Sequence, residues 1–534
     1  MRRLLHLFLP LALMAVLAAC SSGLPAKWMD SLDTPLWKGE MVGIRAAVFV
    51  PGGARGMTVS VEGVPFVQAS FLTAVKGDVL DEKYDQCGKH TLSDCDSILV
   101  FDRIGNESKL DVTPGDTQYV WLSIRVPEQC MAGKYTGRMV IRGEGIRTTR
   151  LPFSFSVSHK ALPPSSAWKF HLDLWQNPYS VARFYGVEPW SEAHFNYMRP
   201  IMSLLAQAGQ KVVTATIIEK PWNAQTHDPF ASMIVKRRSP DGQWSYDYSV
   251  FDRWVEFMEE LGIDKQINCY TMIPWKLTFD YLDEASGQVC YLKAAPGSRE
   301  YEEYWDSFLK DFAAHLRSKG WFSKTRIAMD ERPLDAMTAC LKVIRHAVPD
   351  FGVALAGNYH EELQADIADL CIRSSELFPA EILKGRRVGK QVSTYYTSCS
   401  EKYPNTFLAS DPREATWLAW YALAGDFDGY LRWAYNSWTE NPVSDARFRT
   451  WPAGDCFFVY PDGCSSVRFE RLLEGIQDYE KVKILSAEWE SMGNVQKLDL
   501  RDRVLNQFSI PNLAAEGPEQ AISAARKALF SEPD

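Results

Sequence analysis

The chain has 534 residues, which is enough for two or three domains with a large hydrophobic core. Its formal charge of −9 argues against non-specific binding to nucleic acid, because such binding needs a basic surface. The 18 tryptophans and 22 tyrosines are an excess of flat aromatic faces, against which sugar rings stack, although any single one is more often a core residue.

The N-terminus is typical of a bacterial lipoprotein signal over residues 1–19. Arg2 and Arg3 precede an apolar segment, and small residues lead directly to Cys20. We expect cleavage before Cys20, lipidation of its side chain, and a change of the formal charge to −11 as the two arginines are removed. The alternative is an ordinary secretory signal cut near Ala19, and either reading takes the protein out of the cytoplasm. Because no acidic run follows Cys20, we expect an outer-membrane lipoprotein that faces the periplasm rather than the cell surface.

The other ten cysteines predict disulfides and core residues rather than a metal site. Two pairs, each spaced eight residues apart in polar segments, are candidates for small disulfides: Cys87 with Cys95, and Cys456 with Cys464. Three more cysteines lie in apolar segments and are predicted to be free: Cys269, Cys340 and Cys371. No cysteine or histidine spacing is typical of a metal site and no glycine-rich phosphate motif occurs, so we expect neither a metal nor a cofactor.

After a tether at 20–27, the region 28–160 is predicted to form an antiparallel β-sandwich. Val120, Leu122, Ile124 and Val126 alternate along one strand, and a turn at Gly133 leads into the next. Glycine-rich breaks separate further short strands, as in known sandwiches. The proline-rich segment 161–167 then excludes a helix and is predicted to be a stiff linker.

Strand-like and helix-like segments alternate through 168–492, and 493–534 is predicted to be a helical extension. The eight candidate strands are 168–174, 211–217, 266–272, 326–329, 352–356, 369–373, 391–397 and 429–434. Amphipathic stretches lie between or after them at 192–208, 251–261, 301–318, 334–347, 412–424 and 468–492. Eight βα units predict a (β/α)8 barrel, and a doubly wound open sheet is the alternative.

In such a barrel, chemistry gathers at the carboxyl ends of the strands, and several predicted strand ends carry carboxylates, amides or aromatic rings. These candidates are Asp173, Trp175 and Asn177; Asp330 and Glu331; Asn358 and Tyr359; Tyr396; and Trp433, Tyr435, Asn436 and Trp438. Such a mixture around one cavity describes a sugar-binding site. For each aromatic residue, packing in the barrel or its loops is the alternative.

The adjacent acids Asp330 and Glu331 are the strongest catalytic candidates. They end an apolar strand and are followed by Pro333, and two neighbouring carboxylates repel one another unless one has a chemical task. Alternatively, they only cap the next helix, where unpaired backbone N–H groups favour carboxylates. Successive strand residues point to opposite faces, so both reach one ligand only if the backbone bends after Asp330.

Three longer segments carry a resemblance to a known family. They are Asp-Gly-Tyr-Leu-Arg-Trp-Ala-Tyr-Asn-Ser-Trp at 428–438, Arg-Phe-Arg-Thr-Trp-Pro-Ala-Gly-Asp at 447–455, and Glu-Gly-Ile-Gln-Asp-Tyr-Glu at 474–480. Together with Asp330-Glu331 on the fourth predicted strand, they resemble glycoside hydrolase family 123. The resemblance covers 168 to about 485, and the preceding sandwich fits the architecture of the family.

The resemblance implies an exo-acting, retaining β-N-acetylgalactosaminidase that uses the acetamido group of its own substrate as nucleophile, an exception to the scheme with two catalytic carboxylates. Glu331 would be the general acid and then the base. Asp330 would stay ionised, accept the acetamide N–H and stabilise the oxazolinium-like intermediate, while its charge favours a proton on Glu331. Tyr396 or Tyr359 would donate a hydrogen bond to the acetamido carbonyl, and the ring of Trp433 or Trp438 would form the floor of the sugar subsite.

Two other functions remain open from the sequence. One is a lipid-anchored glycan-binding protein without activity, against which the intact acid pair argues. The other is a glycosidase of different specificity, for β-N-acetylglucosamine or an unacetylated galactoside, because the loops that distinguish these sugars are not located by spacing. A scaffold protein would need none of the polar strand ends. The expected partner is therefore an oligosaccharide or a glycolipid glycan.

Overall fold

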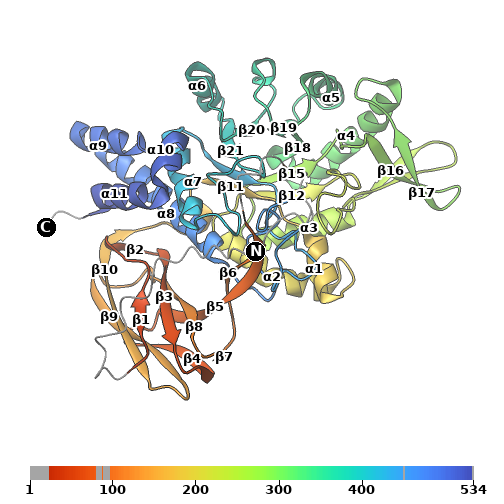
Figure 1. The fold of residues 1–534 in the computed structure, drawn as a ribbon. Coiled ribbons are helices and arrows are strands. Elements are labelled where there is room, and N and C mark those ends of the chain that lie inside the picture. Colours follow the sequence, from red (N-terminus) through yellow and green to blue (C-terminus); the bar gives the residue numbers. More distant parts are fainter. Residues whose placement is uncertain (1–22, 80–86, 88–96, 449–450, 532–534) are drawn as a thin grey trace, which may run out of the picture.

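The computed structural model describes residues 23–79, 87, 97–448 and 451–531. It has an N-terminal part built from β-strands and a larger part in which helices surround a parallel barrel (Figure 1). The predicted signal, with Cys20, lies outside the described residues. Among the described residues, no helix has the length and apolar character needed to cross a membrane.

The N-terminal part contains two five-stranded sheets. The first has the order β1 (Ala26–Trp28), β3 (Met41–Val50), β8 (Asp116–Arg125), β5 (Val67–Asp78), β6 (Ser97–Ile104). The second has the order β2 (Leu36–Lys38), β10 (Thr149–Ala161), β9 (Gly133–Glu144), β4 (Ala54–Glu62), β7 (Leu110–Val112). All neighbours are antiparallel except β2 and β10. Val48 of β3, Met57 of β4 and Met139 of β9 are buried in one apolar cluster, so the two sheets share a core.

The eight predicted strands of the larger part are all present and form one parallel sheet. They are β11 (His171–Leu174), β12 (Val212–Thr216), β15 (Gln266–Tyr270), β18 (Thr325–Asp330), β19 (Gly352–Ala356), β20 (Asp369–Arg373), β21 (Val392–Tyr396) and β22 (Gly429–Arg432). Their order is β11-β22-β21-β20-β19-β18-β15-β12, and the sheet curls until its two edges meet. There the amide of Lys211 donates to the carbonyl of Leu172, which nearly closes a barrel of the predicted kind.

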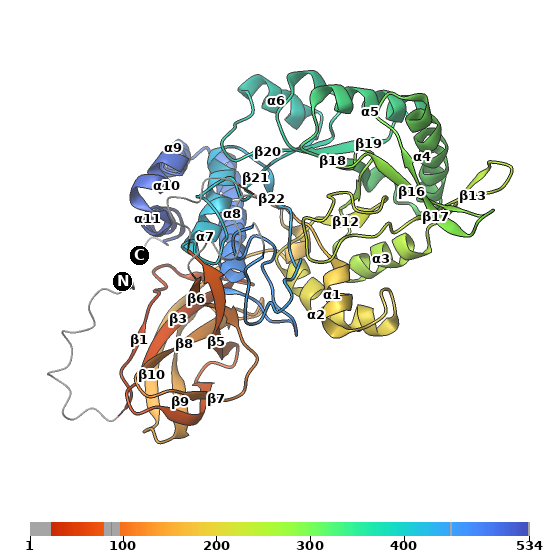
Figure 2. The same cartoon turned by 45° about the vertical axis from the view of Figure 1, so that its right-hand side comes forward.

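Helices cover the outside of the barrel (Figures 1 and 2). They are α1 (Pro178–Tyr185), α2 (Glu192–Gln207), α3 (Ser249–Glu260), α4 (Arg299–Lys319), α5 (Leu334–Ala347), α6 (Ala380–Val388), α7 (Arg413–Ala424) and α8 (Val467–Ser491). In α4 the side chain of Ser298 caps the start, Gly320 ends the helix at a φ of +73°, and Trp305 and Phe308 lie on its buried face. The predicted C-terminal extension contains α9 (Val495–Leu505), α10 (Ile510–Glu516) and α11 (Pro518–Phe530).

A small sheet of four strands was not predicted. It consists of β13 (Val235–Arg238), β14 (Trp244–Asp247), β16 (Thr278–Asp283) and β17 (Gln288–Lys293), in the order β14-β13-β16-β17. These strands belong to the segments that follow β12 and β15, and they project from the side of the barrel (Figure 2). Their polar composition has no sustained helical period, but short exposed hairpins also leave only a weak signal in sequence.

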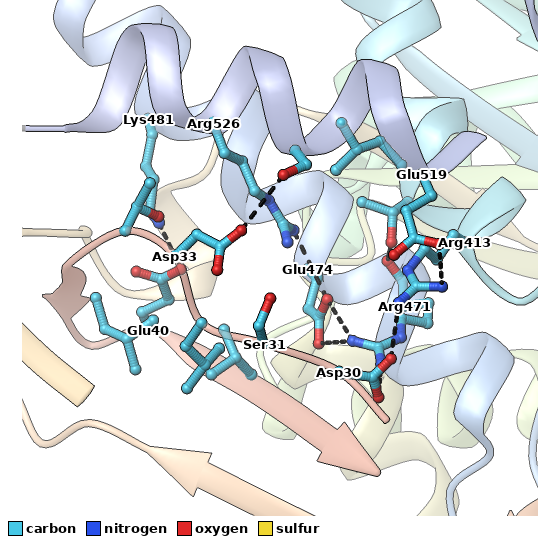
Figure 3. A pocket seen from close by; sticks show the side chains of 17 residues that line it. Asp30, Ser31, Asp33, Glu40, Arg413, Arg471, Glu474, Lys481, Glu519 and Arg526 are labelled. Carbon is cyan, nitrogen blue, oxygen red and sulfur yellow. Dashed lines mark hydrogen bonds and ion pairs between the residues drawn. The ribbon is translucent and has the colours of Figure 1, made fainter. Parts of the chain in front are cut away.

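A buried network of charges joins Asp30 of the N-terminal part to α7 and α8 beside the barrel (Figure 3). Asp30 accepts hydrogen bonds from Arg45, Arg413 and Arg471, and Arg471 also pairs with Glu474. Burial alone would raise the pKa of Asp30, but the arginines hold it well below its usual range. Such a network fixes how the two parts sit against each other, because removing one partner would strand a buried charge.

The disulfide prediction was wrong for both cysteine pairs. Cys87 is bonded to Cys399, which follows β21, across a sequence separation of 312 residues, and Cys95 lies outside the described residues. Cys456 and Cys464 are free, and both are buried in the main apolar core, where the Cys464 sulfur accepts a hydrogen bond from Arg103. The prediction of free, buried cysteines at 269, 340 and 371 is confirmed.

Candidate active site

The carboxyl ends of the barrel strands open into a cavity of about 400 Å³. Five of the residues predicted to be catalytic or substrate-binding line it: Trp175, Asp330, Glu331, Tyr396 and Trp433. They lie at the ends of β11, β18, β21 and β22 or directly after them, and the parallel barrel brings these ends to one mouth.

Seven predicted site residues do not line this cavity: Asp173, Asn177, Asn358, Tyr359, Tyr435, Asn436 and Trp438. The two asparagines at 177 and 436 are fully buried. The side-chain amide of Asn436 accepts from the backbone N–H of Asn177 and donates to its carbonyl, while the side chain of Asn177 caps α1. Tyr435 donates to the carbonyl of Ile201, and Trp438 donates to that of Val459. These four side chains therefore pack the chain after β22 against α1, α2 and the following loop.

The remaining three of these residues have different surroundings. Asp173 is buried inside the barrel and accepts a hydrogen bond from Asn268. Burial, with Asp369 nearby, raises the pKa of Asp173 to about 7. Asn358 is exposed, and Tyr359 packs against Phe378.

The cavity also contains residues that the sequence analysis missed, among them Trp222, Gln225, Trp275, Arg373 and Trp451. Trp222 stacks on Trp175 with ring centroids 4.8 Å apart. Arg373 ends the sixth strand, so the rule that placed the other candidates at strand ends applies to it as well. The tryptophans at 222, 275 and 451 lie in loops, and no periodicity marks them.

Asp330 is a buried carboxyl with one oxygen free to accept. The indole N–H of Trp275 donates to its Oδ2 at 3.1 Å, and Arg332 donates to its backbone carbonyl while lying over the ring of Trp275. Its Oδ1 has no hydrogen-bond partner among the described residues. Burial raises the pKa of Asp330 to about 6, with Arg332 and Trp275 opposing the rise and Glu331 adding to it. A buried acceptor without a donor is a site for the N–H or O–H of a ligand.

Glu331 follows Asp330 through the backbone bend that the paired roles require. Its φ is +36°, in the left-handed region that side chains rarely occupy, and its amide donates to the carbonyl of Ala356 at 2.7 Å. A Cβ on Gly357 would lie 2.8 Å from the Glu331 nitrogen, so glycine is needed for this approach. The bend lets both carboxylates face the same cavity.

Glu331 is exposed, and its carboxylate accepts a hydrogen bond from one side chain among the described residues. The hydroxyl of Tyr396 donates to Glu331 Oε1 at 2.9 Å, and Arg373 Nε donates to that hydroxyl at 3.3 Å. One acid is thus buried beside a tryptophan and the other is open to solvent. Such a pair can divide the work of charge stabilisation and proton transfer.

The disulfide is part of the cavity wall. Cys87 and Cys399 both contribute to the lining, together with Ser398 and Ser400, so the N-terminal part supplies at least one residue to the site. Among the described residues, no group of three or more His, Cys, Asp or Glu side chains is arranged to hold a metal ion.

Comparisons with known proteins cover both parts of the chain. Residues 175–485 match the model of the glycoside hydrolase 123 catalytic domain, and residues 26–143 match that of the glycoside hydrolase 123 N-terminal domain. A comparison with curated proteins found no match.

Among solved structures, a family 123 glycoside hydrolase from Clostridium perfringens, whose study concerns glycolipid glycan hydrolysis, superposes with a TM-score of 0.84. It is 26% identical, over 92% of this chain and 92% of that chain. A family 39 glycoside hydrolase from Bacteroides cellulosilyticus WH2 has a TM-score of only 0.35 at 8% identity, over 83% and 82% of the two chains, and carries no argument. The model of the catalytic domain matches more than half of this chain, and the chain therefore belongs to glycoside hydrolase family 123.

Proposed function

We propose that the protein is an exo-acting, retaining β-N-acetylgalactosaminidase that removes terminal β-linked N-acetylgalactosamine from glycans. The observation that carries this proposal is the buried Oδ1 of Asp330, beside Glu331 in a cavity lined with tryptophans. This oxygen accepts no hydrogen bond from the described residues, although Arg332 Nε lies 4.0 Å away. An acetamide N–H is a suitable donor for that oxygen, and the aromatic faces suit a sugar ring. The solved relative acts on glycolipid glycans, which makes a glycolipid one candidate source of the sugar.

In the first step of the proposed mechanism, the acetamido carbonyl oxygen attacks the anomeric carbon while the glycosidic bond breaks. Glu331 gives its proton to the departing oxygen. Asp330 accepts the acetamide N–H and stabilises the positive charge that develops on the oxazolinium ring. In the second step, Glu331 takes a proton from water, which adds to the anomeric carbon from the face the leaving group vacated. The bond between that carbon and the acetamido oxygen breaks at the same time, so the neutral acetamide is restored. Two inversions give net retention.

The contacts refine two further roles. Tyr396 uses its only hydroxyl proton on Glu331, so we assign it to orient the general acid, whereas the sequence alone suggested a contact with the acetamido carbonyl. Trp433 is fixed by a hydrogen bond from its indole N–H to Asp455, and it stands in the cavity as a platform for the sugar. We retain the proposal that lipid on Cys20 holds the enzyme at the periplasmic face of the outer membrane.

The proposal is tested with para-nitrophenyl β-glycosides of N-acetylgalactosamine, N-acetylglucosamine and galactose. We expect turnover of the first, weak turnover of the second and none of the third, because galactose lacks the acetamido nucleophile. Proton NMR of the first product formed should show the β-anomer. Turnover of the galactoside would overturn the substrate-assisted route. Preference for the glucosaminide would keep that route but make the enzyme a β-N-acetylglucosaminidase. Absence of turnover of all three would favour a glycan-binding protein.

The raised pKa of Asp330 predicts the acidic limb of the pH profile. Because the protonated carboxyl cannot stabilise positive charge, kcat/KM on the para-nitrophenyl substrate should fall as the pH drops through about 6. Trp275→Phe removes the N–H that favours the carboxylate, so this limb should move to higher pH. If kcat/KM instead falls only near pH 4, the ordinary carboxyl range, and does so equally in Trp275→Phe, the titration of Asp330 does not control the rate.

Gly357→Ala should displace Glu331 and lower kcat by about 10²-fold, because an added Cβ would meet the backbone of Glu331. We also expect a loss of roughly 1–3 kcal/mol in the free energy of unfolding, since neither backbone segment yields easily. The matched control is Gly385→Ala, in the middle of α6, where a Cβ meets nothing. That variant should keep full activity and gain a little stability. Equal behaviour of the two variants in turnover and thermal unfolding would contradict the role of Gly357.

A further inference from the structure

Arg373 lines the cavity with a guanidinium group that is only partly used by the protein. It ends β20, where its backbone is in register with Tyr396 of β21, and its side chain helps to line the cavity. Nε donates to the Tyr396 hydroxyl, whereas neither terminal nitrogen has a hydrogen-bond partner among the described residues. Among the described residues no carboxylate forms an ion pair with this guanidinium. The hydrogen bond to Tyr396 raises the pKa of Arg373, and the more distant carboxylates of Glu331 and Glu401 add to the rise.

Other arginines near the cavity are used by the protein itself. Arg332 donates a hydrogen bond to the backbone carbonyl of Asp330 and lies over the ring of Trp275. Arg432 is fully buried and forms an ion pair with Asp455, which in turn holds Trp433. Arg373 differs because two of its nitrogens, with up to four N–H donors, remain available on the cavity side. The hydrolytic mechanism proposed above gives these donors no task.

The contacts also place Arg373 on one side of the reacting centre. Asp330 is bound on its side by Trp275 and Arg332, whereas Glu331 is bound to Tyr396 and, through it, to Arg373. A general acid must face the glycosidic oxygen, so the sugar that carries the leaving oxygen lies on the Glu331 side. The guanidinium is therefore near the departing sugar rather than near the acetamido group.

We propose that Arg373 binds an anionic group on the sugar next to the terminal N-acetylgalactosamine, a carboxylate or a sulfate ester. This inference rests on the proposed function. A guanidinium matches the two oxygens of either anion, and the tryptophan-lined walls limit the water that would screen the pair. The preferred substrate is then an acidic glycan, although the protein as a whole carries a net negative charge.

The test compares two matched pairs of disaccharides, each with terminal β-linked N-acetylgalactosamine. In one pair the second sugar is glucuronic acid or its methyl ester; in the other it is galactose with or without a sulfate ester. We expect the wild type to favour at least one charged member by about tenfold or more in kcat/KM, and the arm that responds identifies the anion. Arg373→Gln should remove that preference, and Arg373→Lys should retain part of it.

Arg199→Gln is the control, because Arg199 is a surface arginine that pairs with Glu260 and does not line the cavity. It should keep the wild-type ratio. A preference below twofold in both arms, or one that persists in Arg373→Gln, would overturn the proposal. Equal losses on charged and neutral members would instead make Arg373 a support for Tyr396, which also overturns it.

Binding of the same four disaccharides to Glu331→Gln is measured by calorimetry, so that charge discrimination is read without turnover. No turnover of any β-N-acetylgalactosaminide by the wild type would be a failure of the proposed function. Absence of charge discrimination in binding would be a failure of the anion site. The two failures are therefore distinguishable.

Discussion

Asp330→Asn is expected to lower kcat on para-nitrophenyl β-N-acetylgalactosaminide by about 10²- to 10³-fold or more. The amide has nearly the same shape as the carboxyl but carries no charge to stabilise the oxazolinium intermediate. Half of its orientations would also point an N–H at the substrate N–H. Unchanged turnover in a folded variant would remove Asp330 from the mechanism.

The same variant should be more stable than the wild type at neutral pH. The folded protein raises the pKa of Asp330 from 3.8 to about 6, so the folded state holds this proton more tightly than the unfolded state does. Stability is therefore lost as the pH rises from about 4 to about 6, and above that range the ionised carboxyl costs about 3 kcal/mol. Asp330→Asn removes this cost, so its melting temperature should exceed that of the wild type at pH 7 and approach it near pH 4.

Asp335→Asn is the matched control for this prediction. Asp335 is an exposed carboxylate in the first turn of α5, where it stabilises the unpaired N–H groups of the helix. Its replacement should leave kcat unchanged and lower the melting temperature slightly. A variant that loses activity while gaining stability identifies a residue kept for chemistry, since a structural residue would lose both.

The catalytic strand could be located from sequence because its signals are local. An apolar run, two acids and Pro333 mark where β18 ends, and the alternation of strands and helices predicts that all eight strand ends meet. Trp175, Tyr396 and Trp433 follow from the same rule, and the structure brings them into the cavity with the acid pair.

The rest of the site depends on contacts between distant segments. The chain after β22 turns away, so that Tyr435 and Trp438 contact α2 and a later loop, although Trp433 only two residues before Tyr435 lines the cavity. The three loop tryptophans also depend on contacts with distant segments. Trp222 stacks on Trp175, and Trp451 packs against Trp433. Trp275, which is partly exposed, donates to Asp330. In the same way, Cys95 lies only eight residues from Cys87 in the sequence, but Cys87 is bonded to Cys399, which the fold brings near it. The spacing of residues along the sequence does not predict contacts between distant segments.

Glu331→Gln should reveal proton donation through its dependence on the leaving group. A natural sugar departs as an alkoxide unless it is protonated, whereas nitrophenolate is stable enough to leave without help. We expect kcat/KM, which reports the steps through departure of the leaving group, to fall by about 10²- to 10⁴-fold for a disaccharide with terminal β-linked N-acetylgalactosamine. The loss on the para-nitrophenyl substrate should be much smaller.

Tyr396→Phe provides the comparison, because it removes the hydroxyl that holds Glu331 Oε1 and keeps the ring. Its losses should be smaller than those of Glu331→Gln and should show the same dependence on the leaving group, since a misplaced acid is a weaker acid catalyst. Equal losses of Glu331→Gln on both substrates would contradict a proton donor and make Glu331 a binding residue. The left-handed backbone at Glu331 would then have no chemical reason, because glycine would occupy that conformation without strain.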